Sequence, residues 1–414
     1  MQVAAVIEAL KKRLQQKPIS CEKVLPTAAV RRGGAALRAP WPAPAALVWA
    51  LAIGVFVVGA GVMLTPHERA VYWLRDLKVY STAVSTFAAG ADPYRSALAR
   101  HAGGLFFTGP PFVWWLYKRV AESPLRPLVR HGLIAAGLIS SAVLPLMQSR
   151  LLLGDRPERL ALGAAVFFAA FSGAGFIAAL AMNNGTVLYA LIVAALFPAI
   201  ARDRWIFFHA AVALATAFKP FYAAFWLVPL LADGISARHL AGCLAGAAAA
   251  ASAYLVPALA APALFAEWLH ALYKQTLIDG LLGTNVFAAV FQWSIAPGRG
   301  LAPYEAQLAL SGVLLLASLT LAHTDRPRRT AGLMLTAVFL NPRLMPYDIC
   351  IAAIPLLACV AGAESALRQG IWAFLLVAGT IGPWAAEAAG FLFPCLAVLA
   401  LLVAIGYPRP SAAA

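Results

Sequence analysis

Two charged residues far apart in the chain have surroundings that favour a chemical role. Asp76 lies in a polar stretch with Arg75 and Lys78, and Lys219 interrupts a long apolar segment directly before Pro220. A carboxylate next to water can act as a general base. An ammonium group at the edge of an apolar region can bind a phosphate as a compact point charge. The pair therefore suggests proton removal at one position and phosphate binding at the other.

Both residues also have structural explanations. A carboxylate near the start of a helix can cap its N-terminus or pair with a neighbouring cation, and the spacing supports this structural role of Asp76 and the role of a general base equally. Lys219 could extend its charge to the lipid headgroups. An ammonium inside a membrane costs at least about 2.5–3.5 kcal/mol, and such residues are usually functional. Because Pro220 also forces a break in the helix, we favour phosphate binding for Lys219.

Several polar and aromatic residues are predicted on the same side of the molecule as Asp76 and Lys219. Amide side chains suit sugar hydroxyls because they both donate and accept hydrogen bonds, and Arg343 could form a forked contact with a phosphate. Taken singly, the asparagines are explained as well by helix caps, Arg343 by a headgroup contact and Asp92 by a turn. Their shared side favours a binding site. The candidate binding residues are Tyr80, Asp92, Tyr94, Asn184, Asn285, Arg343 and Tyr347.

The composition indicates that a lipid bilayer surrounds these residues. Of 414 residues, 62% are hydrophobic and 12% are charged, and the mean hydropathy is +0.79. A soluble domain has about 25% charged residues. Unpaired backbone groups are costly in lipid, so spanning segments are helices or closed barrels. The apolar runs, such as 45–64 and 390–406, are continuous and do not alternate as barrel strands do, which favours helices.

The sequence predicts an all-α, polytopic transmembrane helical bundle with about twelve crossings, each requiring about 20 residues. The basic tail at 1–44 precedes the transmembrane domain at 45–406, and a short tail follows at 407–414. Since Lys and Arg collect in cytoplasmic loops, both termini are predicted inside. The predicted crossings are 45–64, 131–148, 160–181, 186–200, 206–218, 221–232, 238–257, 304–322, 331–341, 347–361, 371–386 and 390–406.

The first outer loop, 65–105, is the longest polar stretch after the tail. It is predicted to contain an amphipathic helix in the membrane interface. Segment 105–120 is interpreted as re-entrant or interfacial, because the later arginines then fall mostly inside. Three predicted helices, 206–218, 221–232 and 331–341, are short, and short or broken helices usually line a cavity within the protein. The apolar face of the interfacial helix comprises Trp73, Leu77, Tyr80, Val84 and Phe87.

The same features disfavour several other classes of protein. The net charge of +15 could indicate nucleic-acid binding, but basic cytoplasmic loops explain it better, so no nucleic-acid partner is expected. The five cysteines show no metal-ligand spacing, and the chain has no glycine-rich loop for a nucleotide phosphate. We therefore expect no metal ion and no cofactor.

The order of these features resembles glycosyltransferase family 87, which has the membrane-embedded C-type glycosyltransferase fold. The resemblance spans roughly 45–400. The chain departs from the family pattern at two places: the late loop lacks the family's usual Trp and His, and Asn184-Gly185 stands where the family usually has Gly-Gln. Four segments carry it: 76–80 leading to Gly90-Ala-Asp-Pro-Tyr94, the aromatic-x-Pro-Pro pattern at 107–111, Lys219-Pro220 after a small-residue helix, and Asn341-Pro342 with Tyr347.

The resemblance implies transfer of a sugar, mannose or a pentose, from a polyprenyl-phosphate-linked donor. The acceptor would be a lipid or cell-envelope glycan on the extracytoplasmic face of the inner (plasma) membrane. Asp76 would remove the proton of the acceptor hydroxyl, and Lys219, with Arg343, would hold the donor phosphate. The competing hypotheses are a transporter or flippase of lipid-linked sugars and a non-enzymatic scaffold. A transporter usually carries internal repeats, and none is visible in the sequence.

Overall fold

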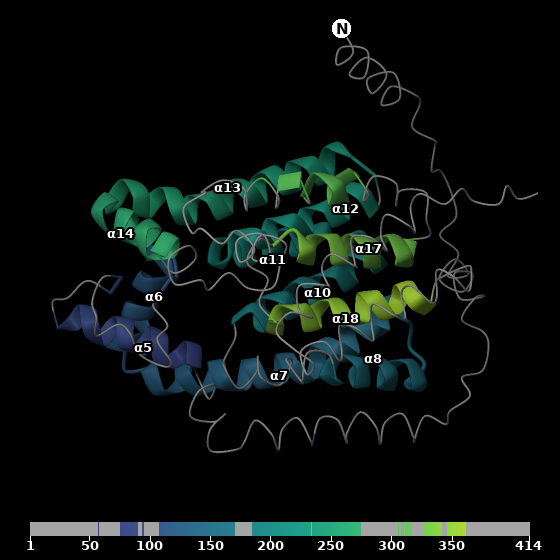
Figure 1. The fold of residues 1–414 in the computed structure, drawn as a ribbon, viewed down its shortest axis with the longest axis horizontal. Coiled ribbons are helices and arrows are strands. Elements are labelled where there is room, and N and C mark those ends of the chain that lie inside the picture. The colour runs from purple at the N-terminus through teal and green to yellow at the C-terminus, as the bar shows by residue number, and fades with distance from the viewer. Residues whose placement is uncertain are drawn as a thin grey trace, which may run out of the picture. The chain divides into compact units, whose positions relative to one another are not determined.

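The computed structural model describes part of the chain, and every regular element in that part is helical (Figure 1). The chain divides into two units, Met1–Ala39 and Pro40–Ala414, and all described residues belong to the second. The predicted all-α class is confirmed for these residues. The predicted basic tail and the crossings at 371–386 and 390–406 lie outside them. The described residues are 57, 75–89, 93–94, 107–169, 184–232, 234–274, 305, 308–309, 311–316, 326–341 and 346–361.

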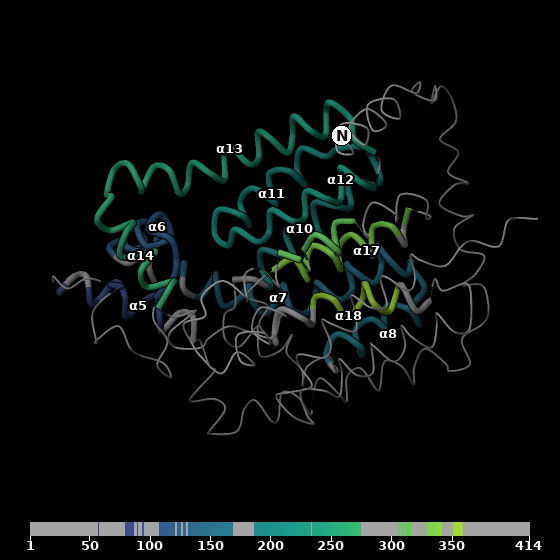
Figure 2. The backbone as a smooth tube through the Cα atoms, turned by 45° about the horizontal axis from the view of Figure 1, so that its top comes forward, coloured from purple at the N-terminus to yellow at the C-terminus, as the bar shows by residue number. Residues whose placement is uncertain are grey.

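Most of the described helices pack side by side as a bundle (Figures 1 and 2). A single apolar core that includes Phe167, Ile192, Phe208 and Met334 lies between them. The bundle consists of α7 (Arg126–Leu152), α8 (Pro157–Ala169), α10 (Asn184–Arg202), α11 (Trp205–Phe218), η2 (Pro220–Trp226), α12 (Leu227–Ala232), α13 (Ala237–Ala260), α17 (Arg326–Phe339) and α18 (Pro346–Ala361).

Three further helices gather near one end of this bundle in both views (Figures 1 and 2). They are α5 (Arg75–Ala88), α6 (Pro111–Glu122) and α14 (Pro262–Tyr273). A second, mainly aromatic core joins them. Helix α6 has 12 residues, so it is about 18 Å long, against about 30 Å for the hydrocarbon core of a bilayer. Its predicted re-entrant or interfacial placement stays a prediction.

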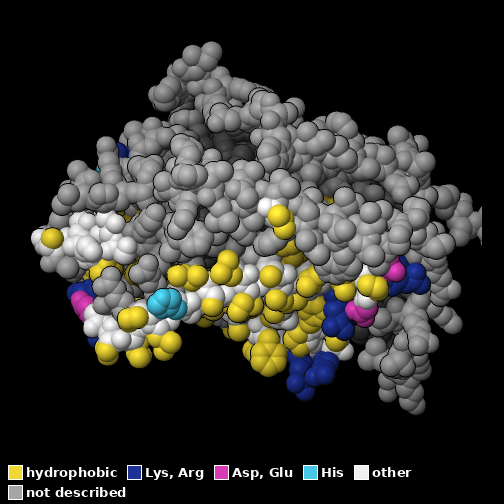
Figure 3. All heavy atoms as spheres, turned by 90° about the horizontal axis from the view of Figure 1, so that it is seen from below, with side chains coloured by type: hydrophobic (Ala, Val, Ile, Leu, Met, Phe, Trp, Pro, Cys, Tyr) yellow, Lys and Arg dark blue, Asp and Glu magenta, His cyan; other side chains and the backbone are white. Residues whose placement is uncertain are grey.

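Two helices, Pro127–Leu152 and Ala237–Ala260, are long and apolar enough to cross a membrane. Only 33% and 22% of their most apolar windows are buried, whereas a core helix of a soluble protein is mostly buried. Large apolar side chains, such as Ile139 and Leu244, face outward along them. Figure 3 shows a band of hydrophobic side chains on one face, with charged side chains at its two ends. This distribution matches a surface that lipid covers.

Helix α13 packs unusually close to its neighbours. An added Cβ at Gly242 would lie 2.4 Å from the ring of His209 on α11, and one at Gly246 would lie 2.7 Å from the ring of Trp226 on η2. These two glycines, four residues apart, face the bundle and let the helix backbones approach, as small residues do in membrane helices. The close contact fixes the position of α13 beside α11.

A buried glutamine compensates for a proline in the bundle core. Pro355 lies inside α18 and has no N–H, so the carbonyl of Ile351, four residues earlier, lacks its usual helical partner. The Nε2 group of Gln148 on α7 donates to that carbonyl at 2.9 Å and to the hydroxyl of Tyr189 at 3.0 Å. The side chain of Gln148 therefore ties three helices together.

Several predicted helix boundaries need correction. The stretch predicted as one helix at 221–232 is a 3₁₀ helix, η2, followed by the short α12. Helix α17 begins five residues before the predicted 331, since its arginines continue the helix instead of ending it. Helix α14, with 12 residues, was not predicted.

The predicted apolar face of the interfacial helix is described only in part. Its members Tyr80 and Val84 on α5 are half-buried, and the side chains of Trp73, Leu77 and Phe87 lie outside the described part of the structure. Among the described side chains of α5, Val79, Ala83 and Thr86 are buried on the side that packs against α6.

Candidate functional site

The helix break at Lys219 is where the candidate site begins. Helix α11 ends at Phe218, and Lys219 has an extended backbone with φ −143° and ψ 106°. The N–H of Lys219 still donates to the carbonyl of Ala215 at 2.8 Å. Pro220 has no N–H, so the carbonyl of the next residue, Thr216, loses its helical donor. The side chain of Lys219 is half-buried at this end of the helix.

A tyrosine from another helix supplies the missing donor. The hydroxyl of Tyr254 on α13 donates to the carbonyls of Thr216 and Ala217, at 2.9 Å and 2.8 Å. Its single hydrogen is thus shared between two acceptors. The ring of Tyr254 stacks on Trp268 of α14, with centroids 5.8 Å apart. The end of α11 is therefore connected through Tyr254 to α14.

Trp268 continues this connection to the segment before α6. Its Nε1 donates to the carbonyl of Thr108 at 3.0 Å. One residue further, the carbonyl of Gly109 accepts a hydrogen bond from the hydroxyl of Tyr94 at 2.9 Å. The ring of Tyr94 stacks on Phe107, with centroids 5.5 Å apart. The candidate residue Tyr94 is thus a buried anchor of the segment that leads into α6.

Helix α6 also contacts the end of α11 directly. The rings of Phe112 on α6 and Phe218, the neighbour of Lys219, meet edge to face with centroids 5.4 Å apart. We call this region the aromatic end of the bundle. It comprises Lys219 with Tyr80, Tyr94, Phe107, Thr108, Phe112, Phe218, Tyr254 and Trp268.

The candidate residue Tyr80 belongs to the same region. Its ring lies 5.4 Å from that of Phe107 and 4.8 Å from that of Tyr117, measured between centroids. Asp76 lies on α5 four residues, or about one helical turn, before Tyr80. The side chain of Asp76 lies outside the described part of the structure. The structure thus brings the α5 backbone near Asp76 and the helix end at Lys219 to one end of the bundle.

The remaining candidate residues are only partly described. Helix α17 runs antiparallel to η2 and α12, so Asn341, just after α17, lies toward the same end as Lys219. The Asn341 side chain is 1% exposed. Asn184 is the first residue of α10 and Tyr347 the second of α18, and only their backbones are described. Asp92, Asn285 and Arg343 lie outside the described residues.

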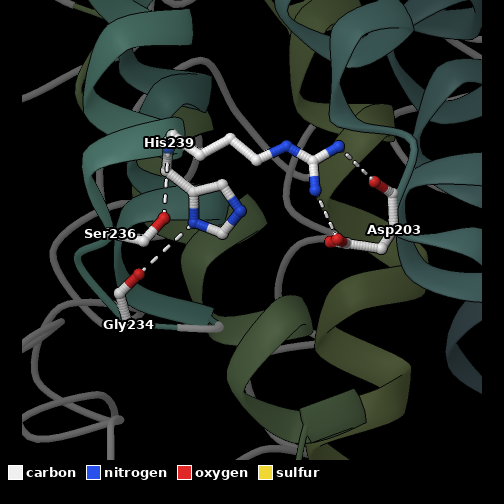
Figure 4. A network of polar contacts seen from close by, with 5 residues as sticks. Asp203, Gly234, Ser236 and His239 are labelled. Atoms are coloured by element: carbon white, nitrogen blue, oxygen red, sulfur yellow. Dashed lines mark hydrogen bonds and ion pairs between the residues drawn. The ribbon is translucent and has the colours of Figure 1, made fainter. Parts of the chain in front are cut away.

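The opposite end of α11 is rich in arginine. Arg238, on the first turn of α13, pairs with the carboxylate of Asp203 and donates to its carbonyl at 2.9 Å (Figure 4). The Ser236 hydroxyl accepts from the N–H of His239 at 3.1 Å and so caps α13. We call this region the basic end. Further bonds there run from Arg326 to the carbonyl of Ile200, at 3.3 Å, and from Arg329 to that of Ala232, at 2.6 Å.

Chemically, the aromatic end combines an ammonium group with tyrosine and tryptophan side chains. Such a site can bind a phosphate through Lys219 and pack a sugar ring or an apolar chain against aromatic rings. Within the described residues, no three His, Cys, Asp or Glu side chains come together as metal ligands. Comparison of the chain with family models, with curated proteins and with solved structures found no match.

Sequence analysis missed Tyr254 and Trp268, which hold this region together. One available signal was Tyr254 itself, a hydroxyl within the apolar stretch 238–257. The other was Pro220, which always frees the carbonyl four residues earlier when it follows a helix. The pairing of the two could not be predicted, because 34 positions separate Pro220 from Tyr254 and only the packing of α13 on α11 brings them together.

Proposed function

We propose that this chain is a polytopic membrane glycosyltransferase. It transfers a glycosyl group, mannose or a pentose, from a polyprenyl-phosphate-linked donor to a glycan or glycolipid acceptor on the extracytoplasmic face of the plasma membrane. The observation that carries the proposal is the packing of α6 against the end of α11 beside Lys219, together with the bond from Tyr94 of the first outer loop to the segment before α6. The order of motifs that resembles glycosyltransferase family 87 supports it.

The proposed reaction uses two charged residues in different steps. The acceptor hydroxyl attacks the anomeric carbon of the donor, and Asp76 takes the proton that the hydroxyl loses. The bond between the anomeric carbon and the phosphate oxygen breaks, and the electron pair leaves with the polyprenyl phosphate. Lys219, together with Arg343, stabilises the negative charge that develops there. A positioned base contributes about 10²–10⁴-fold to such a reaction.

The proposed membrane topology follows from the two ends of the bundle. Arginines collect at the basic end, as they do on the cytoplasmic side of membrane proteins. The aromatic end then faces outward, where tyrosine and tryptophan suit the headgroup region. The outward-facing apolar side chains of α7 and α13 support lipid contact. We propose about twelve crossings in all, each of about 20 residues or shorter where a helix is broken.

A transporter or flippase of lipid-linked sugars is the second candidate. The observation that favours it is the interruption between α11 and η2, because broken helices bind substrates in many transporters. Purified protein in lipid vesicles distinguishes the two functions. A flippase moves the labelled lipid-linked sugar across the bilayer without forming a glycosylated product.

The decisive experiment is a transfer assay with purified protein and a panel of polyprenyl-phosphate sugars. Asp76→Asn should lower transfer at least about 100-fold, because the amide cannot accept the proton. The matched control is Asp203→Asn at the basic end, which should transfer normally. Monodisperse protein with an unchanged helical circular dichroism spectrum confirms that the Asp76 variant is folded. Normal turnover by the Asp76 variant would exclude the proposed mechanism.

A further inference from the structure

The last turn of α11 depends on a hydrogen-bond donor from outside its own helix. Thr216 and Ala217 are buried, at 7% and 9% exposure, so water does not readily replace a missing donor for their carbonyls. Pro220 cannot donate to Thr216, and the extended backbone of Lys219 ends the helix before the N–H of Phe221 could donate to Ala217. The hydroxyl of Tyr254 satisfies both carbonyls.

The same side chain also faces the segment that leads into α6. Tyr254 stacks on Trp268, and Trp268 donates to the carbonyl of Thr108. The stacked pair Tyr254 and Trp268 therefore contacts both the last turn of α11 and the segment before α6 that Tyr94 anchors. Tyr254 sits on α13, whose place beside α11 is fixed by the close approach at Gly242.

We propose that Tyr254 is a positioning residue for Lys219. Its hydroxyl fixes where α11 ends and therefore where the ammonium group stands relative to the segment that leads into α6. Trp268, through its hydrogen bond to Thr108, fixes the position of the segment that leads into α6. The inference rests on the proposed function, in which Lys219 binds the phosphate of a polyprenyl-phosphate sugar. It adds that the phosphate site is formed by three helices, α11, α13 and α14, and not by Lys219 alone.

The first test is kinetic and uses Tyr254→Phe, which keeps the stacked ring and removes the hydroxyl. Loss of this hydrogen bond should lower kcat/KM for the donor about 3–10-fold. KM for the acceptor should stay unchanged. The matched control is Tyr273→Phe on α14, which removes an exposed hydroxyl and should change neither value. Equal losses for donor and acceptor would indicate general destabilisation and overturn the proposal.

A double-mutant cycle shows whether Tyr254 acts through Lys219. In the Lys219→Ala background the ammonium is gone, so Tyr254→Phe should have no further effect on donor kcat/KM. An undiminished effect in that background would overturn the proposal. If Tyr254→Phe does not fold, Trp268→Phe takes its place, since it keeps an aromatic ring and loses the bond to Thr108.

The position of residue 219 can also be measured without any reaction. Lys219→Cys is labelled with a membrane-impermeant maleimide, and the labelling of the five native cysteines in the wild type is subtracted. Adding Tyr254→Phe should change the labelling rate at least about threefold, the effect of one lost hydrogen bond, whereas Tyr273→Phe should not. If the wild type transfers no sugar, the proposed function fails while the labelling still decides the positioning. Unchanged labelling with an active wild type overturns the positioning alone.

Discussion

The two ends of α11 lie in regions that meet the same backbone requirement with different chemistry. At both ends, helix or turn carbonyls without helical partners accept hydrogen bonds from side chains of other segments. At the basic end the donors are arginines: Arg238 to Asp203, Arg326 to Ile200 and Arg329 to Ala232. At the aromatic end the donors are neutral: Tyr254 to Thr216 and Ala217, Trp268 to Thr108, and Tyr94 to Gly109.

The difference shows how one bundle can have a structural end and an end suited to binding. A guanidinium satisfies carbonyls strongly, and its charge suits the cytoplasmic surface of a membrane. Neutral donors satisfy the carbonyls at the aromatic end without adding charge there. Among the described residues that form this end, the ammonium of Lys219 supplies the charge that an anionic ligand would meet. We therefore expect substitutions at the basic end to change stability and those at the aromatic end to change transfer.

The largest effect in this comparison should come from Lys219→Ala. Loss of a charge-assisted contact to phosphate should lower kcat/KM for the donor about 10–100-fold, with little change in thermal unfolding. Lys219→Arg keeps the charge and should retain more activity than the alanine variant. Kinetics with a polyprenyl-phosphate sugar measure both. If Lys219→Ala lowers the unfolding temperature strongly and leaves the kinetics intact, the two ends do not differ in the way proposed.

The second-largest effect, a loss of stability, should come from Arg329→Met at the basic end. The carbonyl of Ala232 then loses a charged donor at 2.6 Å, which should reduce the free energy of unfolding by about 1.5–3 kcal/mol. Transfer per folded molecule should be unchanged. Denaturant or thermal unfolding in detergent micelles measures the stability, and Arg329→Lys should recover part of it. A loss of transfer without a loss of stability would contradict the assignment of this end as structural.

Some features of the two ends of the bundle could be predicted from the sequence, and others could not. The break at Lys219-Pro220 was predicted correctly, because proline ends a helix by local chemistry alone. Most described helices also lie where the apolar runs placed them, since apolar length is a local property. The hydrogen bonds of Tyr254 and Trp268 were not predicted, because they join residues more than 30 positions apart. The sequence identifies which carbonyls need donors, whereas packing decides which side chains supply them.

A smaller effect is expected between the two ends, where Gln148 donates to the carbonyl of Ile351, which lacks its helical donor because of Pro355. Gln148→Leu should reduce the free energy of unfolding by about 1 kcal/mol, a typical value for one net hydrogen bond. Pro355→Ala restores an N–H that can bond to the carbonyl of Ile351. In that background Gln148→Leu should therefore cost less, and a double-mutant cycle of unfolding free energies measures the difference. Strict additivity would show that Gln148 does not act on this carbonyl.

The smallest effect should come from Asp203→Asn. This change removes the ion pair with Arg238 and keeps the hydrogen bond from Arg238 to the backbone carbonyl of residue 203. The pair with Arg238 is exposed, at 62% and 67% of the two side chains, and such pairs contribute about 0–1 kcal/mol. Arg238 still donates to the carbonyl of residue 203, and asparagine tolerates the positive φ of 54° found there. We therefore expect a loss below about 1 kcal/mol that shrinks further when salt is raised. A much larger, salt-independent loss would mean that the carboxylate itself, and not the arginine bond to the backbone, holds the basic end together.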